Sequence, residues 1–270
     1  MGGAPRSGTT LLRNLLDRHP GIRAGAETKL FVPGAFNLAW LAEAYEVPRP
    51  ELDAMRRSSA SQAAFIDAFA VHVRTAAGKG RWAEKTPQNI RHLDWILARF
   101  PGASVIHIIR DGRDVICSMR QHPDWRWLES GWQKVPVPRS LAWYAQRWLA
   151  DTAAGMAWQQ DSRYVEVRYE DLVSDPGATM RAVCDGIGEP AGVDWLTLVG
   201  RRAGPAEGGG DAGDVGQTAD AMDQPTGRLD YEGAVSDASV GRWRTDLSAA
   251  EQREVMRHCG TRLRELGYEV

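Results

Sequence analysis

Apolar residues recur along this chain with two spacings, one typical of helices and one typical of buried strands. Residues 9–17 carry leucines at positions 11, 12, 15 and 16, which places them on one helical face, and His19-Pro20-Gly21 ends the pattern. Residues 104–109, SVIHII, form an almost unbroken apolar run. Such a run predicts a strand that is buried on both faces within a parallel sheet.

The same spacings, together with capping and breaking residues, predict the other elements. Helices are expected over 36–77 with an interruption at 48–50, from Thr86-Pro87 to about 100, over 113–120, over 176–187, and over 249–266 with Ser248 as N-cap. Further strands are expected at 81–84 and 164–167. Strands that alternate with helices of this length predict an α/β fold, a mainly parallel sheet flanked by helices.

Residues 203–228 differ from the rest in composition, because they are rich in Gly, Ala and Asp and carry few large apolar side chains. We expect a flexible loop or lid there rather than a linker between domains, since too little chain follows to build a second domain. The 270 residues are therefore expected to form a single domain, 1–270.

Charge and cysteine content narrow the class of protein. The formal net charge is −2, from 33 basic and 35 acidic residues, so we expect no general attraction to nucleic acid or to anionic membranes. The three cysteines are odd in number and widely spaced, which argues against a disulfide framework and against a cysteine metal site. No run approaches the roughly 20 apolar residues of a membrane span, and no signal peptide is visible. The expected location is cytoplasmic, and an anchor upstream of Met1 stays open.

The stretch GGAPRSGTTLL at 2–12 is the first candidate site, since it matches the phosphate-binding pattern G-x-x-x-x-G-K-[ST] except at the lysine. Thr9 stands in the lysine position, and Arg6 is the only cation of the loop. Gly8 is expected at a helix N-terminus, where backbone N–H groups and the helix dipole favour an anion. Because a buried strand normally precedes such a loop, we expect the first strand to be truncated at the N-terminus.

Three more segments are expected to converge on this loop: Arg23–Lys29 (RAGAETK), AEKTP around Lys85, and Ile108–Met119 (IIRDGRDVICSM). Ligands of parallel sheets bind at the C-terminal ends of strands. Arg6, Lys85 and Arg110 all follow predicted strand ends.

With these four segments the chain resembles the sulfotransferases that use 3′-phosphoadenosine 5′-phosphosulfate, and most of all the protein-tyrosine sulfotransferases and their bacterial relatives. The resemblance continues through VRYEDLVSDP at 167–176, VGRW at 240–243 and LGYE at 266–269, so it covers nearly the whole chain. It implies a P-loop-like sulfotransferase fold and transfer of a sulfuryl group to a hydroxyl acceptor. A sulfuryl group carries one charge where a terminal phosphoryl group carries two, so no metal is expected.

The resemblance also implies a role for each motif residue. The 5′-phosphosulfate would be held by the loop residues Arg6, Ser7, Gly8, Thr9 and Thr10. The 3′-phosphate would be held by Arg110 and Ser118, with Tyr169 packed near the nucleotide and Arg242, or alternatively Arg244, closing over it.

Two residues would carry the chemistry. Glu27 stands 21 positions after Arg6, where the family has its general base, although the first of the family's two adjacent glutamates is Ala26 here. Lys85 would stabilise negative charge on the leaving group.

Several alternatives stay open from the sequence. The acceptor is a tyrosine, another phenol, a sugar or a lipid hydroxyl, and the oligomeric state is undetermined. A P-loop phosphotransferase and a non-catalytic nucleotide-binding module are the competing functions. Arg113 is ambiguous and is expected to pair with Asp114. Trp143 and Trp148 are expected in the core, within a tryptophan-rich region at 125–158 whose role is open.

Overall fold

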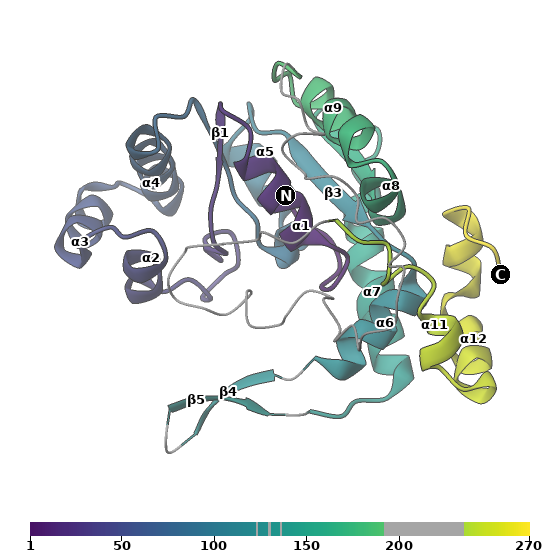
Figure 1. The fold of residues 1–270 in the computed structure, drawn as a ribbon. Helices are drawn as coiled ribbons and strands as arrows, with labels where there is room; N and C mark the ends of the chain where they lie inside the picture. The colour runs from purple at the N-terminus through teal and green to yellow at the C-terminus, as the bar shows by residue number, and fades with distance from the viewer. Residues whose placement is uncertain (123, 129–130, 136, 192–234) are drawn as a thin grey trace, which may run out of the picture.

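The computed structural model describes residues 1–122, 124–128, 131–135, 137–191 and 235–270 (Figure 1). The expected lid at 203–228 lies outside these residues and stays a prediction. Within the described part, no helix is both long enough and apolar enough to cross a membrane.

Parallel strand pairs form the middle of the molecule, and three of their four strands were predicted from the sequence, whereas the strand at Ile22–Ala24 was not. β1 (Ile22–Ala24) pairs with β2 (Arg81–Ala83), and β3 (Val105–Ile109) pairs with β6 (Tyr164–Arg168). Gly2 adds a parallel bridge to β3. Every residue of β3 is buried, which confirms the central strand expected there. Helices cover these strands, so the α/β class is confirmed.

A hairpin lies outside the expected elements. β4 (Asp124–Leu128) and β5 (Gly131–Val135) pair antiparallel and extend from the rest of the molecule at the bottom of Figure 1. The two strands fall in the tryptophan-rich region, for which the residue pattern predicted no element.

The N-terminal helices follow the predicted pattern except that one interruption is displaced and a second, at 59–61, was not predicted. α1 (Thr9–Asp17) buries its leucines as expected. The helical region that follows divides into α2 (Leu38–Ala44), α3 (Arg49–Ser58) and α4 (Gln62–Ala76). The interruption expected at 48–50 lies earlier, because Pro50 is accepted in the first turn of α3, where its missing N–H needs no partner.

The helix expected from Thr86-Pro87 to about 100 is broken. A 3₁₀ helix, η1 (Pro87–Arg91), is followed after His92 by α5 (Leu93–Arg99). Thr86 occupies the N-cap position but makes no side-chain capping hydrogen bond there. Its hydroxyl donates to the Glu84 carboxylate instead, at 2.6 Å. Thr86 therefore bonds to a buried carboxylate instead of capping the helix.

Among the remaining helices, those that begin at Gly112, Pro176 and Ala249 agree with the sequence prediction, whereas those that begin at Leu141, Tyr169 and Trp243 were not predicted. Ser248 and Glu251 form a reciprocal capping box at the start of the last helix. The helices are α6 (Gly112–Gln121), α7 (Leu141–Met156), α8 (Tyr169–Ser174), α9 (Pro176–Gly186), α11 (Trp243–Asp246) and α12 (Ala249–Glu265).

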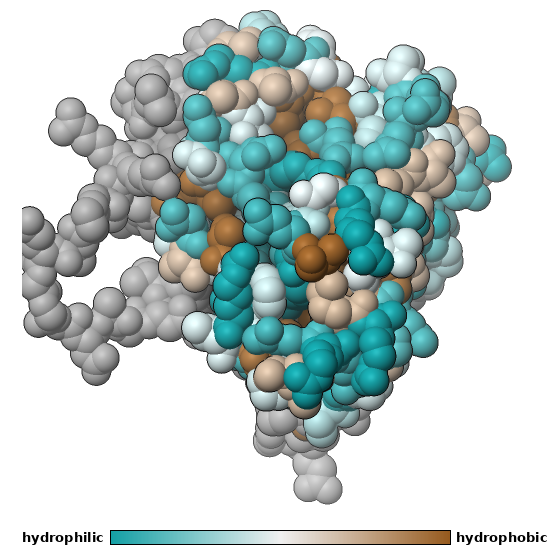
Figure 2. All heavy atoms as spheres, turned by 90° about the vertical axis from the view of Figure 1, so that its right-hand side faces the viewer, coloured by the Kyte–Doolittle hydropathy of each residue, from teal (hydrophilic) through white to brown (hydrophobic). Residues whose placement is uncertain are grey.

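Four groups of buried apolar side chains fill the space between the layers. One joins α1, α8 and α9 to the strands, and a second joins α6, α7 and α12. A third lies among α2, α3 and α4, and a fourth packs η1 and α5 against the start of β3. All three cysteines are unpaired and buried. The face that carries α12 is mainly hydrophilic, with separate small apolar patches (Figure 2).

Candidate active site

Lys85 and Glu27 form an ion pair beside the phosphate loop. The Lys85 Nζ lies 2.5 Å from Glu27 Oε1 and 3.5 Å from the Thr10 hydroxyl. The Lys85 side chain is 3% exposed, whereas the Glu27 side chain is 21% exposed. Burial lowers the pKa of Lys85, and the nearby Glu27 charge opposes that shift. The cation is thus held between the loop and a carboxylate that solvent can reach.

The loop itself has the geometry of an anion site. Arg6 has φ 71° and Gly8 has φ 93°, both in the left-handed region. A side chain at Gly8 would lie 2.3 Å from the Tyr169 ring, so only glycine fits. Gly8 caps α1 without a side-chain hydrogen bond, and the first turn holds no acidic residue. The backbone N–H groups of the first turn of α1 are therefore available to an anion.

Arg6 connects this loop to the fourth sequence segment. Its Nε donates to the Ser118 hydroxyl at 3.0 Å, from a loop to the middle of α6. Arg110 Nη1 donates to the Arg6 carbonyl at 3.2 Å, and the Arg110 guanidinium lies 4.3 Å from the centre of the Tyr169 ring. The structure thus brings together the residues expected around the nucleotide phosphates.

Two buried polar atoms at this place have no hydrogen-bond partner within the described residues: the Ser7 hydroxyl and Arg110 Nε. Seven other buried side-chain atoms of the described residues also lack a partner, so these two atoms are available to a ligand but do not by themselves identify a site. Both belong to residues expected to hold the phosphosulfate or the 3′-phosphate. The residues present therefore fit an anionic nucleotide.

Glu84 is a residue of the site that the sequence reasoning missed. Its buried carboxylate accepts from the Thr28 N–H at 3.1 Å, the Thr28 hydroxyl at 2.8 Å and the Thr86 hydroxyl, and Asn89 Nδ2 donates to its other oxygen. These bonds tie the segment next to Glu27 to the segment next to Lys85. The only local signal was a glutamate at the end of a strand directly before Lys85.

The backbone around Glu27 is held from α2 and the turn after it as well. Trp40 Nε1 donates to the Glu27 carbonyl at 2.7 Å, and the Tyr45 hydroxyl donates to the Ala26 carbonyl at 2.7 Å. A side chain at Gly25 would lie 2.5 Å from the Tyr45 ring. These contacts fix the path of the main chain through Glu27.

Arg242 bonds to Asp246 and Gln121 rather than to the loop. Its Nε pairs with Asp246 at 2.7 Å, and its Nη2 donates to Gln121 at 2.7 Å. Arg244 lies 4.7 Å from the centre of the Trp243 ring. The structure brings neither arginine to the loop, so the choice between them as nucleotide ligands stays a prediction.

The expected pairing of Arg113 with Asp114 is wrong. Arg113 pairs with Asp111, at 2.7 Å, rather than with Asp114. Asp114 instead accepts from the N–H groups of Gly241 and Trp243, at 2.7 and 3.0 Å, because it faces the chain that leads into α11.

The two tryptophans expected in the core differ in their exposure to solvent. Trp148 is fully buried and donates to the Arg110 carbonyl at 3.2 Å. Trp143 is 38% exposed, so its core prediction is wrong: Arg139 covers its ring at 4.2 Å, on the outside of α7. The side chains of the tryptophans at 125, 127 and 132 lie outside the described part. No group of three His, Cys, Asp or Glu side chains within the described residues is placed to hold a metal ion.

Comparison with known proteins identifies a family. A model of the sulfotransferase family matches residues 1–192. Nodulation protein NoeE of Sinorhizobium fredii is 30% identical over 302 aligned positions, covering 99% of this chain and 65% of that protein. The protein-tyrosine sulfotransferase of Drosophila melanogaster is 32% identical over 123 residues, which cover 44% of this chain and 24% of that protein. The chain spans less than two thirds of the length of these relatives.

Solved structures show the same fold. The sulfotransferase domain of the Synechococcus PCC 7002 olefin synthase superposes with a TM-score of 0.60 at 20% identity, over 99% of this chain and 93% of that domain. The sulfotransferase domain from the curacin biosynthetic pathway superposes with a TM-score of 0.58 at 17% identity, over 99% of this chain and 96% of that domain. The fold implied by the motif resemblance is confirmed.

Proposed function

Because the chain belongs to the sulfotransferase family, we propose that it transfers a sulfuryl group from 3′-phosphoadenosine 5′-phosphosulfate to a hydroxyl acceptor, with Glu27 as general base. The observation that carries this proposal is the position of Lys85, between Thr10 of the phosphate loop and the Glu27 carboxylate. One cation there contacts both the donor side and the acceptor side of the site.

Donor binding rests on the loop and on α6. The N–H groups at the start of α1 and the Arg6 guanidinium would bind the phosphosulfate, and Arg110 with Ser118 would bind the 3′-phosphate. The Arg6–Ser118 hydrogen bond supports this arrangement, since it joins the two expected subsites directly. The unpartnered Ser7 hydroxyl and Arg110 Nε would gain acceptors on binding.

The transfer itself follows from the pair of charges. The acceptor oxygen attacks sulfur in line, an O–S bond forms, and the bond from sulfur to the bridging oxygen breaks. Glu27 takes the hydroxyl proton, and Lys85 stabilises the charge that develops on the departing phosphate oxygen. The products are the sulfate ester and adenosine 3′,5′-bisphosphate. In this structure Lys85 is bound to Glu27, so donor binding must draw the ammonium toward the bridging oxygen and release the carboxylate.

The acceptor class is proposed from the relatives. Their names include protein-tyrosine sulfotransferases, which supports a tyrosine or another phenol as acceptor. A phenol suits a carboxylate base, because its O–H is more acidic than an alcohol O–H.

A transfer assay tests the function. Radiolabelled 3′-phosphoadenosine 5′-phosphosulfate is incubated with tyrosine peptides, simple phenols, sugars and lipid alcohols, with a chelator present throughout. We expect label in a phenolic product. In a parallel reaction with magnesium-ATP and no chelator, ATP hydrolysis together with the absence of sulfuryl transfer would instead identify a phosphotransferase. Tight binding of adenosine 3′,5′-bisphosphate with no transfer to any acceptor would identify a non-catalytic module.

A further inference from the structure

Arg13 is a buried cation in the middle of α1 that makes few bonds of its own. The residue is 2% exposed. Its Nη1 donates to the Gly25 carbonyl at 3.4 Å, and its Nε has no hydrogen-bond partner within the described residues. It forms no ion pair with a carboxylate of that part of the chain either. A charge without a partner is costly to bury, so packing alone does not explain an arginine at this position.

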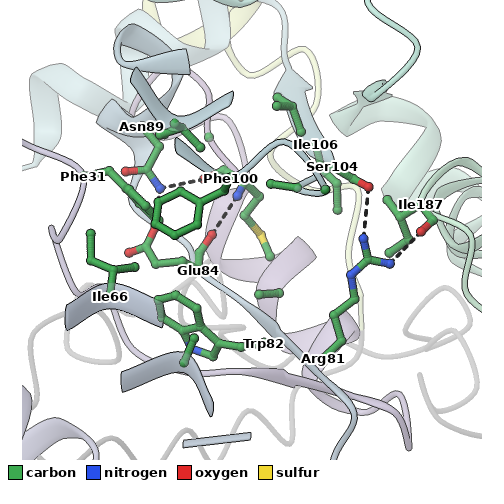
Figure 3. A pocket seen from close by; sticks show the side chains of 18 of the residues that line it. Phe31, Ile66, Arg81, Trp82, Glu84, Asn89, Phe100, Ser104, Ile106 and Ile187 are labelled. Atoms are coloured by element: carbon green, nitrogen blue, oxygen red, sulfur yellow. Dashed lines mark hydrogen bonds between the residues drawn. The ribbon is translucent and has the colours of Figure 1, made fainter. Parts of the chain in front are cut away.

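Two other carboxylates of this region are engaged elsewhere. Asp17 lies one turn after Arg13 on α1, where an ion pair between residues four apart is common, but it pairs with Arg23 at 2.9 Å. Glu84 lies beside Asn89 in the wall of a cavity of about 270 Å³ (Figure 3), and its oxygens accept from that amide and from threonine hydroxyls. The remaining carboxylate of the candidate site is that of the general base, which is bonded to the catalytic lysine.

Arg13 joins the two segments on either side of the Lys85–Glu27 pair. Thr10, which lies 3.5 Å from Lys85 Nζ, precedes Arg13 by three residues and so shares its side of α1. The Gly25 carbonyl, which accepts from Arg13, precedes Glu27 by two residues. The guanidinium therefore lies between the helix that contacts the ammonium and the segment that carries the carboxylate.

The Gly25 carbonyl gives Arg13 a fixed anchor. A side chain at Gly25 would lie 2.5 Å from the Tyr45 ring, and the Tyr45 hydroxyl donates to the Ala26 carbonyl at 2.7 Å. The main chain that receives the guanidinium is thus held by α2 and the turn after it. Arg13 is a cation of fixed position, whereas the proposed reaction requires the lysine ammonium to move.

The charges of these side chains act on one another. Burial lowers the pKa of Arg13 to about 10, and nearby Tyr45, Asp17 and Glu27 oppose that shift. Arg13 therefore keeps its charge at neutral pH. Burial also lowers the pKa of Lys85, with Glu27 opposing the shift and Arg13 adding to it. Arg13 thus attracts the carboxylate and repels the ammonium of the pair.

We propose that Arg13 is a positioning residue of the transfer reaction, the fixed counter-charge that holds the Glu27 carboxylate when the Lys85 ammonium moves to the donor. This inference rests on the function proposed above, in which donor binding draws Lys85 away from Glu27. Repulsion from Arg13 favours that movement, and attraction to Arg13 keeps the carboxylate where it receives the proton of the acceptor hydroxyl. Arg13 acts through these two residues and takes no proton itself.

Replacement of Arg13 tests the proposal. Arg13→Met removes the charge and keeps most of the volume, so kcat should fall about 10- to 100-fold while the affinity for adenosine 3′,5′-bisphosphate changes less than about twofold. The melting temperature should not fall, because an apolar side chain in place of a buried charge is often neutral or stabilising. Arg13→Lys keeps the charge and should retain more of kcat than Arg13→Met does. Arg257→Met, at an exposed position of α12, is the control and should change none of these values.

A kcat for Arg13→Met equal to that of the parent would overturn the proposal. Equal losses of kcat, nucleotide affinity and melting temperature would also overturn it, because a purely structural residue gives that result. A kcat for Arg13→Lys as low as that of Arg13→Met would show that the charge is not what matters.

A measurement without any reaction separates this proposal from the proposed function. Absence of sulfuryl transfer by the parent protein would contradict the function, but the charge interaction can still be measured. The pKa of Lys85 is followed by NMR with ¹³C-labelled lysine in the parent, Arg13→Met and Arg13→Lys. Loss of the neighbouring positive charge should raise the pKa of Lys85 in Arg13→Met, and Arg13→Lys should leave it closer to the parent value. The same pKa in all three proteins would show that Arg13 does not act on the pair.

Discussion

Arg6 and Ser118, 112 positions apart in sequence, are joined by a hydrogen bond of 3.0 Å from the guanidinium to the hydroxyl. The bond links the loop proposed to hold the sulfuryl donor with the helix proposed to hold the 3′-phosphate. Arg6 adopts a left-handed backbone conformation that residues other than glycine rarely adopt. Strain of this kind persists where the surrounding structure maintains it, which is common at functional sites.

Arg6→Lys should lower kcat/KM by about 10- to 100-fold although it keeps the charge. A lysine carries its donors on one nitrogen and has no planar fork, so it cannot keep the Nε bond to Ser118 while separate terminal nitrogens face the donor. A charge-assisted hydrogen bond contributes about 1.5–3 kcal/mol. Steady-state transfer rates measure the loss. An unchanged kcat/KM would remove Arg6 from the donor site.

Thr9→Lys, which restores the ATP-type motif, should not create an ATPase. Magnesium-dependent ATP hydrolysis by that variant would identify a phosphotransferase site.

Glu27→Gln should abolish transfer and leave the affinity for adenosine 3′,5′-bisphosphate nearly unchanged. The amide cannot take the acceptor proton, and its contact with Lys85 lies on the acceptor side of the loop. Isothermal titration with the nucleotide, paired with the transfer assay, separates the two effects. Glu166→Gln, at a surface ion pair on β6, is the matched control and should retain activity. Normal turnover by Glu27→Gln would exclude it as the base.

Ser118→Ala and Arg110→Ala should each weaken binding of the 3′-phosphorylated nucleotide by about 1–3 kcal/mol, the range for hydrogen bonds to charged groups. Binding of the analogue that lacks the 3′-phosphate should change much less in both variants, and this comparison is the control. Arg110→Ala also removes the contact with the Tyr169 ring, so its effect should be the larger. If both variants bind the two nucleotides as the parent does, the 3′-phosphate lies elsewhere.

Glu84→Gln should lower the free energy of unfolding by about 2–3 kcal/mol, because an amide nitrogen would face hydroxyl and N–H donors that now meet a carboxylate oxygen. Urea denaturation measures the change. Since Glu84 ties together the segments that carry Glu27 and Lys85, kcat should fall more than the nucleotide affinity does. A loss of stability with full kcat in the folded fraction would limit Glu84 to a structural role.

As pH rises, kcat/KM should decrease at a pH below the usual pKa range of lysine. Burial lowers the pKa of Lys85, so the cation is lost at a lower pH than that of an exposed lysine. Lys85→Arg should move that basic limb upward, with a lower maximum. The same shift affects stability: the unfolded chain binds more protons between the two pKa values, so Lys85 makes the free energy of unfolding rise with pH in that interval. A basic limb that does not respond to Lys85→Arg would assign it to another group.

Elements whose residue pattern is local could be predicted from the amino-acid sequence alone. α1, β3 and β6 follow from the spacing of apolar residues over a few positions, and α12 begins at Ser248 because the capping box lies within four residues. The convergence of the segments that carry Arg6, Lys85 and Arg110 also followed from the sequence, since the C-terminal ends of parallel strands meet at one edge of a sheet. The place of Glu27 beside them was expected from the family resemblance.

Contacts between side chains that are far apart in sequence could be seen only in the folded structure. Glu27 and Lys85 are 58 positions apart, and their pairing depends on the packing of β1 beside β2. Glu84 has no distinguishing local pattern, because its partners come from two segments that approach each other only in the folded chain. Arg113 pairs with Asp111 and not with Asp114. Trp143 is exposed whereas Trp148 is buried, because helical spacing alone does not show which face of a helix packs against its neighbours. Contacts of this kind depend on the whole packed core, and no short window of residues contains it.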